Sequence, residues 1–227
     1  MRYENVVSGR FISRPNRFIA HIEIGGKEEI CHVMNTGRMK ELLLPGAEVF
    51  LYEGKNPNRK TKYDLIGVRR GDGEIINIDS IAPNKVAAEY IKTLFPGAKL
   101  IKPETFYEKS RFDFYIEDNS DKIFLEVKGV TLNIDGEARF PDAPTERGAK
   151  HLHELIEAKK NGFRACLLFV IAMKGCHSFA ANSATDPKFA NALLEAHENG
   201  VEVFAVDCKV FADEIIADTP VPIRFEK

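Results

Sequence analysis

The chain has 227 residues, of which 44% are hydrophobic and 29% are charged. This length can form one large domain or two small ones, and the apolar share excludes a disordered chain, a collagen-like fibre and a small disulfide scaffold. The longest apolar run, Ala165 to Met173, is too short to span a bilayer, so we expect a soluble, cytoplasmic protein without membrane association. The net charge of −2 excludes a basic field over the whole molecule.

Positive charge is concentrated in the N-terminal third. Between Lys55 and Arg70 there are six basic residues and a single acid, Asp64. The first seventeen residues add four arginines against Glu4 alone. Any electrostatic attraction to phosphates must therefore be local, and we expect it in this third of the chain.

The segment up to Asp79 is predicted to form short strands separated by turns. The six predicted strands are Val6 to Ile12, Phe18 to Ile24, Glu29 to Met34, Glu48 to Tyr52, Tyr63 to Val68 and Glu74 to Ile78. Glycine, proline and asparagine pairs lie between them, and only Arg38 to Leu44 has a helical pattern. This arrangement is typical of a small closed barrel, and we expect a five-stranded OB-type barrel over residues 1–82.

After Pro83 the hydrophobic period changes to that of helices. We expect helices over Asn84 to Phe95, Thr145 to Lys160 and Pro187 to Glu198, with a strand pair after the first and apolar strands after the other two. Asn-Gly pairs follow the two later helices, and Asp186 is placed to cap the last one. Residues 83–227 are therefore predicted to be an α/β domain with a partly parallel sheet, which makes the chain mixed α/β.

Two acidic residues are predicted to face each other across the strand pair. Phe112, Phe114 and Ile116 would share one face of the first strand, which places Asp113 on the other. If Asn119 and Ser120 form a two-residue turn, paired residue numbers sum to 239, and Asp113 lies opposite Glu126. Opposed carboxylates destabilise a strand pair unless positive charge lies between them.

A divalent metal and the ammonium group of Lys128 would supply that charge. Asp113 and Glu126 offer the hard oxygen ligands that Mg²⁺ or Mn²⁺ prefers, and Lys128 is two residues from Glu126 on the same face. The alternative is an exposed, charged edge strand with no metal, because Glu-x-Lys is common on solvated strands. Spacing alone favours this alternative, and the register together with the apolar residues that flank both carboxylates brings the metal site level with it.

A second group of polar residues lies on the predicted helix that begins near Thr145. Ala149, Leu152, Leu155 and Ile156 would form its core face. Arg147, Lys150, His151 and Glu154 fall on nearly the opposite face. One interpretation is an ordinary solvated surface. The other places the first turn beside the carboxylates, with Arg147 and Lys150 contacting phosphate oxygens.

Taken together and in order, several motifs resemble the sugar fermentation stimulation protein (SfsA) family over nearly the whole chain. The motifs are Arg17-Phe18, Asn35-Thr36-Gly37-Arg38-Met39, Arg59-Lys60, Ser110-Arg111-Phe112-Asp113-Phe114, Leu125-Glu126-Val127-Lys128 and Phe140-Pro141-Asp142-Ala143-Pro144-Thr145-Glu146-Arg147-Gly148. The resemblance implies an OB-type barrel followed by a PD-(D/E)xK nuclease-like domain of the restriction-endonuclease type. It also implies DNA binding without marked sequence preference.

In the nuclease-like core that the resemblance implies, Asp113 and Glu126 would ligate the metal together with a backbone carbonyl. Lys128 would orient or activate the attacking water, and Glu104 is a candidate further acidic ligand. The family name comes from a proposed regulatory link to maltose metabolism.

Basic residues of the barrel are the candidate DNA contacts. We expect Arg59, Lys60 and Lys62 to follow the phosphate backbone. Arg17 lies beside Phe18, which is either a stacking platform or, as we expect, a core residue. The turn from Asn35 to Arg38 offers amides and a guanidinium to a phosphate, or is an ordinary entry into a short helix.

The leading hypothesis is a DNA-binding protein with a Mg²⁺-dependent nuclease-type centre. One alternative is a non-catalytic DNA-binding regulator of sugar metabolism that uses the nuclease-like fold as a scaffold. Another is an enzyme acting on a phosphorylated sugar or nucleotide, which the separate basic strip disfavours. A homodimer would suit a nuclease-like fold.

Overall fold

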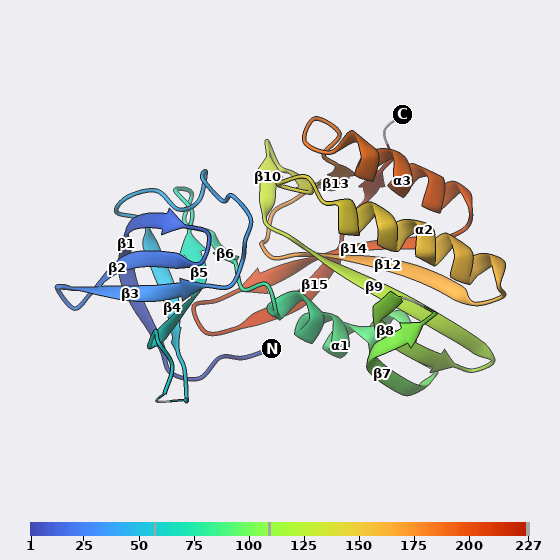
Figure 1. The fold of residues 1–227 in the computed structure, drawn as a ribbon, viewed down its shortest axis with the longest axis horizontal. Helices are drawn as coiled ribbons and strands as arrows, with labels where there is room; N and C mark the ends of the chain where they lie inside the picture. The colour runs from blue at the N-terminus through green and yellow to red at the C-terminus, as the bar shows by residue number, and fades with distance from the viewer. Residues whose placement is uncertain (57, 109, 226–227) are drawn as a thin grey trace.

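The computed structural model describes residues 1–56, 58–108 and 110–225 (Figure 1). A barrel forms its N-terminal part, and an α/β domain forms the rest. The barrel strands are β1 (Val6–Asn16), β2 (Ile19–Ile24), β3 (Lys27–Val33), β4 (Glu48–Glu53), β5 (Tyr63–Arg69) and β6 (Ile75–Asn77).

Five of these strands close into a barrel, as predicted for an OB-type fold. The sheet runs β3-β2-β1-β4-β5-β6, and β3 also pairs with β5 in parallel through His32↔Asp64 and Val33↔Leu65. The inward-facing residues of all five strands, among them Ile22, Val49 and Leu65, pack into one core. Closure leaves the strands around the barrel without open edges.

The predicted short helix between β3 and β4 is wrong. Residues 38–44 form turns, in which the amides of Leu42 and Leu43 both bond to the carbonyl of Met39. Met39 has a φ of 45°, outside the helical region, and its side chain is 1% exposed in the barrel core. The apolar spacing in this segment therefore reflects side chains that cover the end of the barrel.

The α/β domain is built on a six-stranded sheet in the order β15-β14-β12-β9-β8-β7. Strand β12 is parallel to both β9 and β14, which confirms the partly parallel sheet. The elements of this sheet and its helices are α1 (Ala82–Leu94), β7 (Ala98–Tyr107), β8 (Ser110–Asp118), β9 (Asp121–Val130), α2 (Glu146–Lys160), β12 (Arg164–Ile171), α3 (Pro187–Glu198), β14 (Glu202–Val210) and β15 (Ile215–Pro220).

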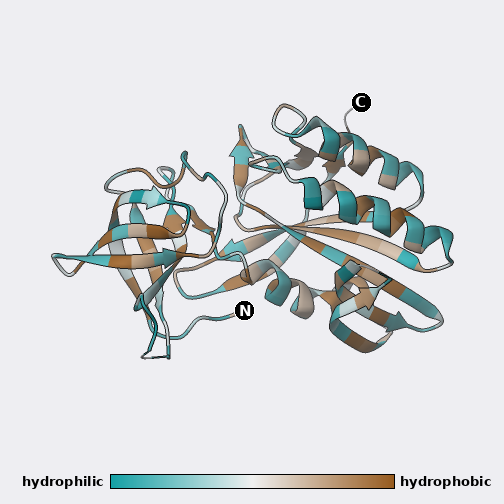
Figure 2. Ribbon diagram, viewed as in Figure 1, coloured by the Kyte–Doolittle hydropathy of each residue, from teal (hydrophilic) through white to brown (hydrophobic). Residues whose placement is uncertain are grey.

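The helices cover both faces of this sheet, with α2 and α3 on one side and α1 on the other (Figure 1). Alternation along β12 shows this directly, because Leu167 and Phe169 pack with α2 and α3 whereas Leu168 and Val170 pack with α1. The strands between the helices are largely hydrophobic, and the outer helix surfaces are hydrophilic (Figure 2). None of the helices in the described ranges is long and apolar enough to cross a bilayer.

Local signals set the ends of α2 and α3 as predicted. The Thr145 hydroxyl accepts a bond from the Gly148 amide (3.1 Å), and the Asp186 carboxylate accepts one from the Phe189 amide (3.0 Å). Gly162 and Gly200 have φ near 84° and 82° just after the two helices. A second sheet that the sequence did not predict lies beside α3, and its order is β10 (Leu132–Ile134), β11 (Glu137–Phe140), β13 (Ser178–Ala181) and β16 (Ile223–Arg224).

Candidate active site

The predicted register of the strand pair is confirmed from Asp118 to Phe114, but the pairing ends there and does not reach Asp113 and Glu126. Asp118 pairs with Asp121 across the two-residue turn, and the pairing continues to Phe114↔Leu125. Beyond that point β8 separates from β9, and Phe112 packs on the α2 side while Phe114 and Ile116 pack on the α1 side. The prediction that these three apolar residues share a face is therefore wrong for Phe112, whose ring lies against His151 of α2.

Asp113 fills the gap where the two strands separate. Its Oδ2 accepts a hydrogen bond from the backbone amide of Val127 (2.8 Å), and its Oδ1 accepts one from Nδ2 of Asn84 (2.8 Å) at the start of α1. Burial and the nearby charge of Glu126 raise the pKa of the Asp113 carboxyl, although these two bonds act in the opposite direction. Both oxygens keep a lone pair for a further ligand.

Glu126 is the most deeply buried acidic side chain of the site, at 2% exposed. Its Oε1 bonds to both Nζ of Lys128 and Nδ1 of His151, whereas its Oε2 is buried and has no hydrogen-bond partner in the described part of the chain. Burial alone would raise the pKa of this carboxyl, but the bond to His151 and the charge of Lys128 outweigh it and lower the pKa. Glu126 is therefore held as a carboxylate with one free oxygen.

That free oxygen fits a hard cation. Leaving a buried acceptor unsatisfied costs on the order of 1–3 kcal/mol, so a ligand for Oε2 would relieve a real penalty. Mg²⁺, Mn²⁺ and Ca²⁺ all take carboxylate oxygens, and Asp113 supplies the second one. Within residues 1–56, 58–108 and 110–225, no group of three or more His, Cys, Asp or Glu side chains is arranged to hold a metal.

Glu104 lies across from Asp113 in the pairing of β7 with β8, between Pro103↔Phe114 and Thr105↔Phe112, but its side chain is engaged elsewhere. It lies in β7 with a φ of 54°, and its carboxylate bonds to Nε of Arg111 (2.7 Å), with both side chains half-exposed. The acidic pair at the centre of the site is therefore Asp113 and Glu126, with Lys128 beside them at 15% side-chain exposure.

His151 and Asn84 contact the acidic pair, and the sequence reasoning missed both. His151 was placed on the solvated face of its helix, but it is 6% exposed. Leu155 and Ala158 follow His151 by four and seven residues, so all three lie on one face of α2 and are buried there. This spacing can be read from the sequence and would have placed His151 on the buried face. No sequence signal indicated Asn84, because its contact with Asp113 depends on how α1 packs against β8.

The two basic residues predicted on α2 are both exposed at its N-terminal end. Arg147 donates from Nε to Nε2 of His151 (3.2 Å), so it reaches the site through the histidine. Lys150 lies 3.4 Å from Glu154 and contacts neither carboxylate of the site.

The predicted basic strip of the barrel is partly neutralised. Arg59 bonds to the buried carboxylate of Asp64, which also bonds to Nδ1 of His32 (3.0 Å). Lys62 lies 3.2 Å from Glu53. Of the three residues, only Lys60 is exposed without an ion-pair partner among the described residues.

The expectation that Phe18 is a core residue is wrong. Phe18 is 51% exposed, and the guanidinium of Arg17 lies 5.9 Å from the centre of its ring. Asn16 occupies the turn, and its side chain accepts bonds from the amides of Phe18 and Ile19, which leaves the aromatic ring outside the barrel.

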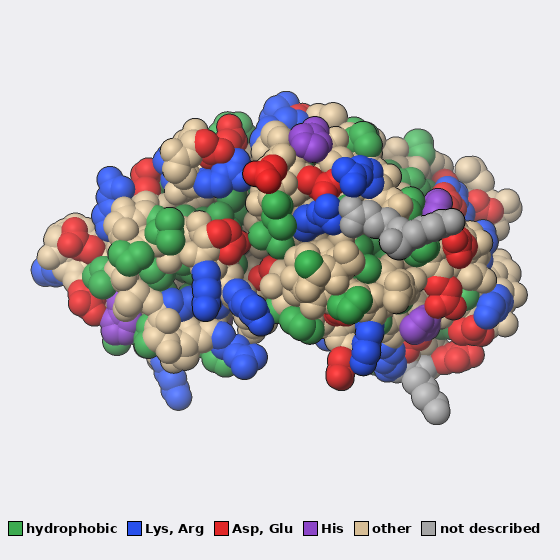
Figure 3. All heavy atoms as spheres, turned by 90° about the horizontal axis from the view of Figure 1, so that it is seen from above, with side chains coloured by type: hydrophobic (Ala, Val, Ile, Leu, Met, Phe, Trp, Pro, Cys, Tyr) green, Lys and Arg blue, Asp and Glu red, His purple; other side chains and the backbone are tan. Residues whose placement is uncertain are grey.

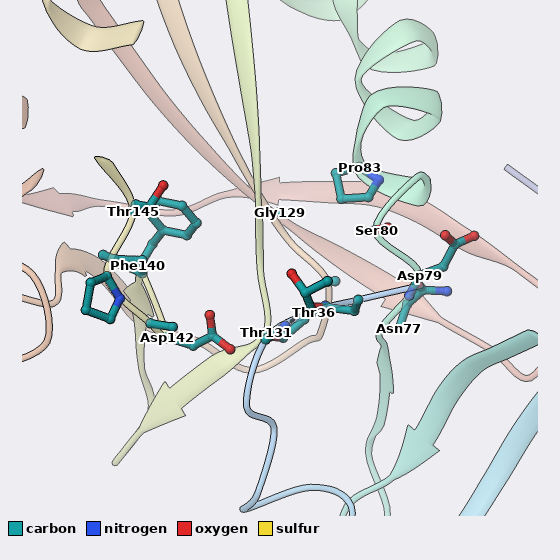
Figure 4. Close-up of a pocket in the computed structure, with 16 residues that line it drawn as sticks. Thr36, Asn77, Asp79, Ser80, Pro83, Gly129, Thr131, Phe140, Asp142 and Thr145 are labelled. Carbon is teal, nitrogen blue, oxygen red and sulfur yellow. Dashed lines mark hydrogen bonds between the residues drawn. The ribbon is translucent and has the colours of Figure 1, made fainter. Parts of the chain in front are cut away.

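The turn from Asn35 to Arg38 uses its amides within the protein. The Gly37 amide donates to the Asn35 side chain (2.8 Å), and the Arg38 amide donates to Asp142 Oδ2 (3.0 Å). These amides are therefore not free for a phosphate, and the Arg38 side chain is the exposed basic group here. Thr36 and Asp142 line a crevice of about 320 Å³ between the barrel and the α/β domain (Figure 4).

This crevice adjoins the acidic pair. Its walls include Pro83, which precedes Asn84, and Gly129, which follows Lys128. Thr145, the cap of α2, closes another side (Figure 4). The carboxyl ends of β9 and β12 thus open toward the barrel, where ligands of α/β sheets commonly bind.

Comparison with known proteins gives consistent matches over the whole chain. The family model described as the SfsA N-terminal OB domain matches residues 12–78, and the one described as the sugar fermentation stimulation protein RE domain matches residues 81–214. A sugar fermentation stimulation protein homolog of Desulfitobacterium hafniense (strain Y51) is 53% identical over 225 residues, covering 99% of this chain and 98% of its own. One from Clostridium beijerinckii is 55% identical over 217 residues, covering 95% and 96%.

A solved structure also matches closely. The structure of Pyrococcus furiosus SfsA in complex with Ca²⁺ superimposes with a TM-score of 0.90 at 32% sequence identity, and the match covers 99% of this chain and 98% of that chain.

Proposed function

This chain belongs to the sugar fermentation stimulation protein (SfsA) family, and we propose that it is a DNA-binding protein with a metal-dependent phosphodiesterase centre at Asp113, Glu126 and Lys128. The observation that carries the proposal is the buried Oε2 of Glu126, which has no hydrogen-bond partner among the described residues and lies beside the Asp113 carboxylate. The Pyrococcus furiosus relative is in complex with Ca²⁺, which supports the binding of a divalent cation by this chain.

Asp113 and Glu126 would hold Mg²⁺ or Mn²⁺. When bound, the cation would supply positive charge to the scissile phosphate and lower the pKa of an attacking water. The chain's own contribution is to fix the ligands, since Val127 and Asn84 hold Asp113 while Lys128 and His151 hold one oxygen of Glu126.

Lys128 is placed to position the nucleophile. Its ammonium group carries three N–H donors, of which one bonds to Glu126. The remaining donors can bond to water or to a phosphate oxygen next to the carboxylates. Its charge also offsets the repulsion between Asp113 and Glu126.

We infer that DNA approaches along basic groups that have no acidic partner in the described ranges. These are the side chains of Arg17 and Arg38 on the barrel, the side chain of Lys60 between β4 and β5 of the same barrel, and the outer nitrogens of Arg147 on α2. Arg59 and Lys62 already pair with acids, so each contributes less to phosphate binding than its charge suggests. Lys and Arg are interspersed with Asp and Glu over the face in Figure 3, which fits a local path better than a uniform basic surface.

The test compares wild type with Glu126→Gln on supercoiled plasmid and on single-stranded DNA, in Mg²⁺, Mn²⁺ or EDTA, with binding measured in parallel. Cleavage should require metal and fall at least about 100-fold in Glu126→Gln, while DNA affinity is retained. The matched control is Glu117→Gln, which removes a carboxylate from the same strand pair where it bonds only to Tyr115 and should leave cleavage unchanged.

Two results would contradict the proposal. Firm DNA binding without cleavage in any metal would favour the non-catalytic regulator, for which the ammonium of Lys128 already offsets the charge of Glu126. Equal loss of cleavage in both variants would show that Glu126 is not a specific ligand.

A further inference from the structure

Arg147, His151 and Glu126 form a chain of hydrogen bonds that leads from the surface of α2 to the buried carboxylate. The Nε of Arg147 donates to Nε2 of His151 (3.2 Å), and Nδ1 of His151 bonds to Oε1 of Glu126. Arg147 is exposed, whereas His151 and Glu126 are 6% and 2% exposed.

The two bonds agree on where the proton of His151 lies, because the Glu126 carboxylate can only accept from Nδ1 and the Arg147 guanidinium can only donate to Nε2. A guanidinium group only donates, so Nε2 of His151 must accept from Arg147 and carries no proton. A neutral imidazole then carries its proton on Nδ1, and Nδ1 donates to Glu126. The opposite tautomer would place two N–H groups against each other at Arg147 and two acceptors against each other at Glu126.

The consequence for the site lies in the two oxygens of Glu126. Oε1 receives both the His151 and the Lys128 bonds, and Oε2 receives none from the part of the chain that the structure describes. Lys128 alone could follow a rotating carboxylate, because its ammonium lies at the end of a flexible chain. The ring of His151 is held by α2 and packs edge-on to Phe112, with ring centres 6.4 Å apart, so it fixes the carboxylate in one orientation.

We propose that Arg147 is a positioning residue, which anchors Nε2 on the far side of the His151 ring, holds that ring against Glu126 and thereby keeps Oε2 of Glu126 free for the cation. This deepens the proposed function, on which its metal-binding consequence rests. Arg147 was predicted from the sequence to contact phosphate, and its two outer nitrogens remain available for that purpose. The Nε bond gives it a separate task that does not require DNA.

The first measurement is ¹⁵N NMR of the His151 ring in the full-length protein without metal or DNA. We expect a protonated Nδ1 and an unprotonated, hydrogen-bonded Nε2 in wild type, and in Arg147→Ala an Nε2 whose ¹⁵N shift shows the loss of that hydrogen bond. A wild-type His151 protonated on Nε2 would overturn the inference without touching the proposed metal centre.

The second measurement is Mn²⁺ affinity by calorimetry in the absence of DNA. Loss of a group that orients a metal ligand typically weakens metal binding about 10- to 100-fold, and we expect Arg147→Ala to fall in that range. Lys150→Ala removes a positive charge from the same helix turn without any bond to His151, and should change Mn²⁺ affinity less than twofold. Equal weakening by the two variants would mean that only charge matters, which overturns the inference.

A double-mutant cycle separates positioning from general damage to α2. Asn in place of histidine presents its amide N–H where Nδ1 stood and has no Nε2 for Arg147 to anchor, so in a His151→Asn background Arg147→Ala should leave Mn²⁺ affinity nearly unchanged. If Arg147→Ala weakened Mn²⁺ binding as much in that background as in wild type, the positioning role of Arg147 would be contradicted. Absence of Mn²⁺ binding in wild type would instead overturn the proposed metal centre, whatever the NMR result.

Discussion

The backbone amide of Arg38 donates to Asp142 Oδ2 (3.0 Å) across 104 residues of sequence, and this bond joins the barrel to the segment that leads into α2. Arg14 holds the turn that carries this amide, since its guanidinium donates to the carbonyls of Gly37 and Asn35 (2.8 Å each). The turn that the sequence offered as a phosphate site is thus a structural contact between the two parts of the molecule.

Gly37→Ala should weaken this contact. A Cβ at Gly37 would clash with Asp142 Oδ2 and lie 2.9 Å from Asn35 Oδ1, so the carboxylate must leave the Arg38 amide. We expect a loss of roughly 1 kcal/mol in the free energy of unfolding, the typical value of one hydrogen bond. Urea denaturation of the full chain measures it, with Gly71→Ala as the control because a Cβ there meets nothing within 4 Å. Equal losses in the two variants would contradict the role given to Asp142.

Arg59 and Lys60 are adjacent in sequence but should respond to mutation in different ways. Arg59→Ala leaves Asp64, which is 5% exposed, with His32 as its remaining ionisable partner. Because removing one member of a buried pair leaves an uncompensated charge, we expect a loss of about 2 kcal/mol in stability. Lys60→Ala should leave stability unchanged, weaken DNA binding similarly for all sequences and lower the slope of log K against log salt by about 1.

Thermal denaturation and salt-dependent fluorescence anisotropy, applied to both variants, separate the two effects. If Arg59→Ala kept wild-type stability and lost DNA affinity, Arg59 would be a phosphate contact and Asp64 would not need it. If Lys60→Ala bound DNA as tightly as wild type at low salt, the path would not pass over this part of the barrel.

Most of the framework could be predicted because its signals are local. Turn residues and alternating strands indicated the barrel, and the two-residue turn at Asn119 and Ser120 set the register that brings Asp113 toward Glu126. The short helix at Arg38 was predicted wrongly because a run of apolar residues that plug a barrel has nearly the same spacing as a helical face.

The parts of the site that could not be predicted depend on contacts between distant elements. Asn84 meets Asp113 only because α1 packs against β8, and Arg59 finds Asp64 only when β5 is in place. Phe18 was assigned to the core from its residue type, but the side-chain bonds of Asn16 turn it outward. Residue type gives the chemistry available, and packing decides which groups meet.

Phe18→Ala should weaken binding of single-stranded DNA more than binding of duplex. An exposed aromatic ring beside Arg17 can stack on an unpaired base, and such a contact is worth about 1–3 kcal/mol per base. We therefore expect single-strand affinity to fall about 5- to 150-fold, with little change for duplex. Phe211→Ala is the matched control, because Phe211 is also 51% exposed but lies beyond β14 in the α/β domain. Equal effects of both variants, or of Phe18→Ala on both forms of DNA, would show that Phe18 is not a stacking platform.

The ion pair between Arg164 and Glu202 predicts a pH dependence of stability. Arg164 donates to both Glu202 oxygens (2.6 and 2.8 Å) and stacks over the ring of Phe95 at 5.1 Å, so the hydrogen bonds lower the pKa of the Glu202 carboxyl. A carboxyl whose pKa is lower in the folded state stabilises the protein above the ordinary glutamate pKa, and loses that contribution as the pH falls through the folded value.

Glu202→Gln should therefore be less stable than wild type at pH 7 by about 0.5–1 kcal/mol, a modest figure because the pair is about one-third exposed. The difference should shrink as the pH falls below about 4.3, the ordinary pKa of glutamate. Urea denaturation at a series of pH values measures this. Glu157→Gln is the control, since its pair with Lys160 is fully exposed and its loss should not be measurable. A difference between Glu202→Gln and wild type that stayed constant down to pH 3 would mean that packing around Phe95, and not the charge of Glu202, stabilises this corner of the sheet.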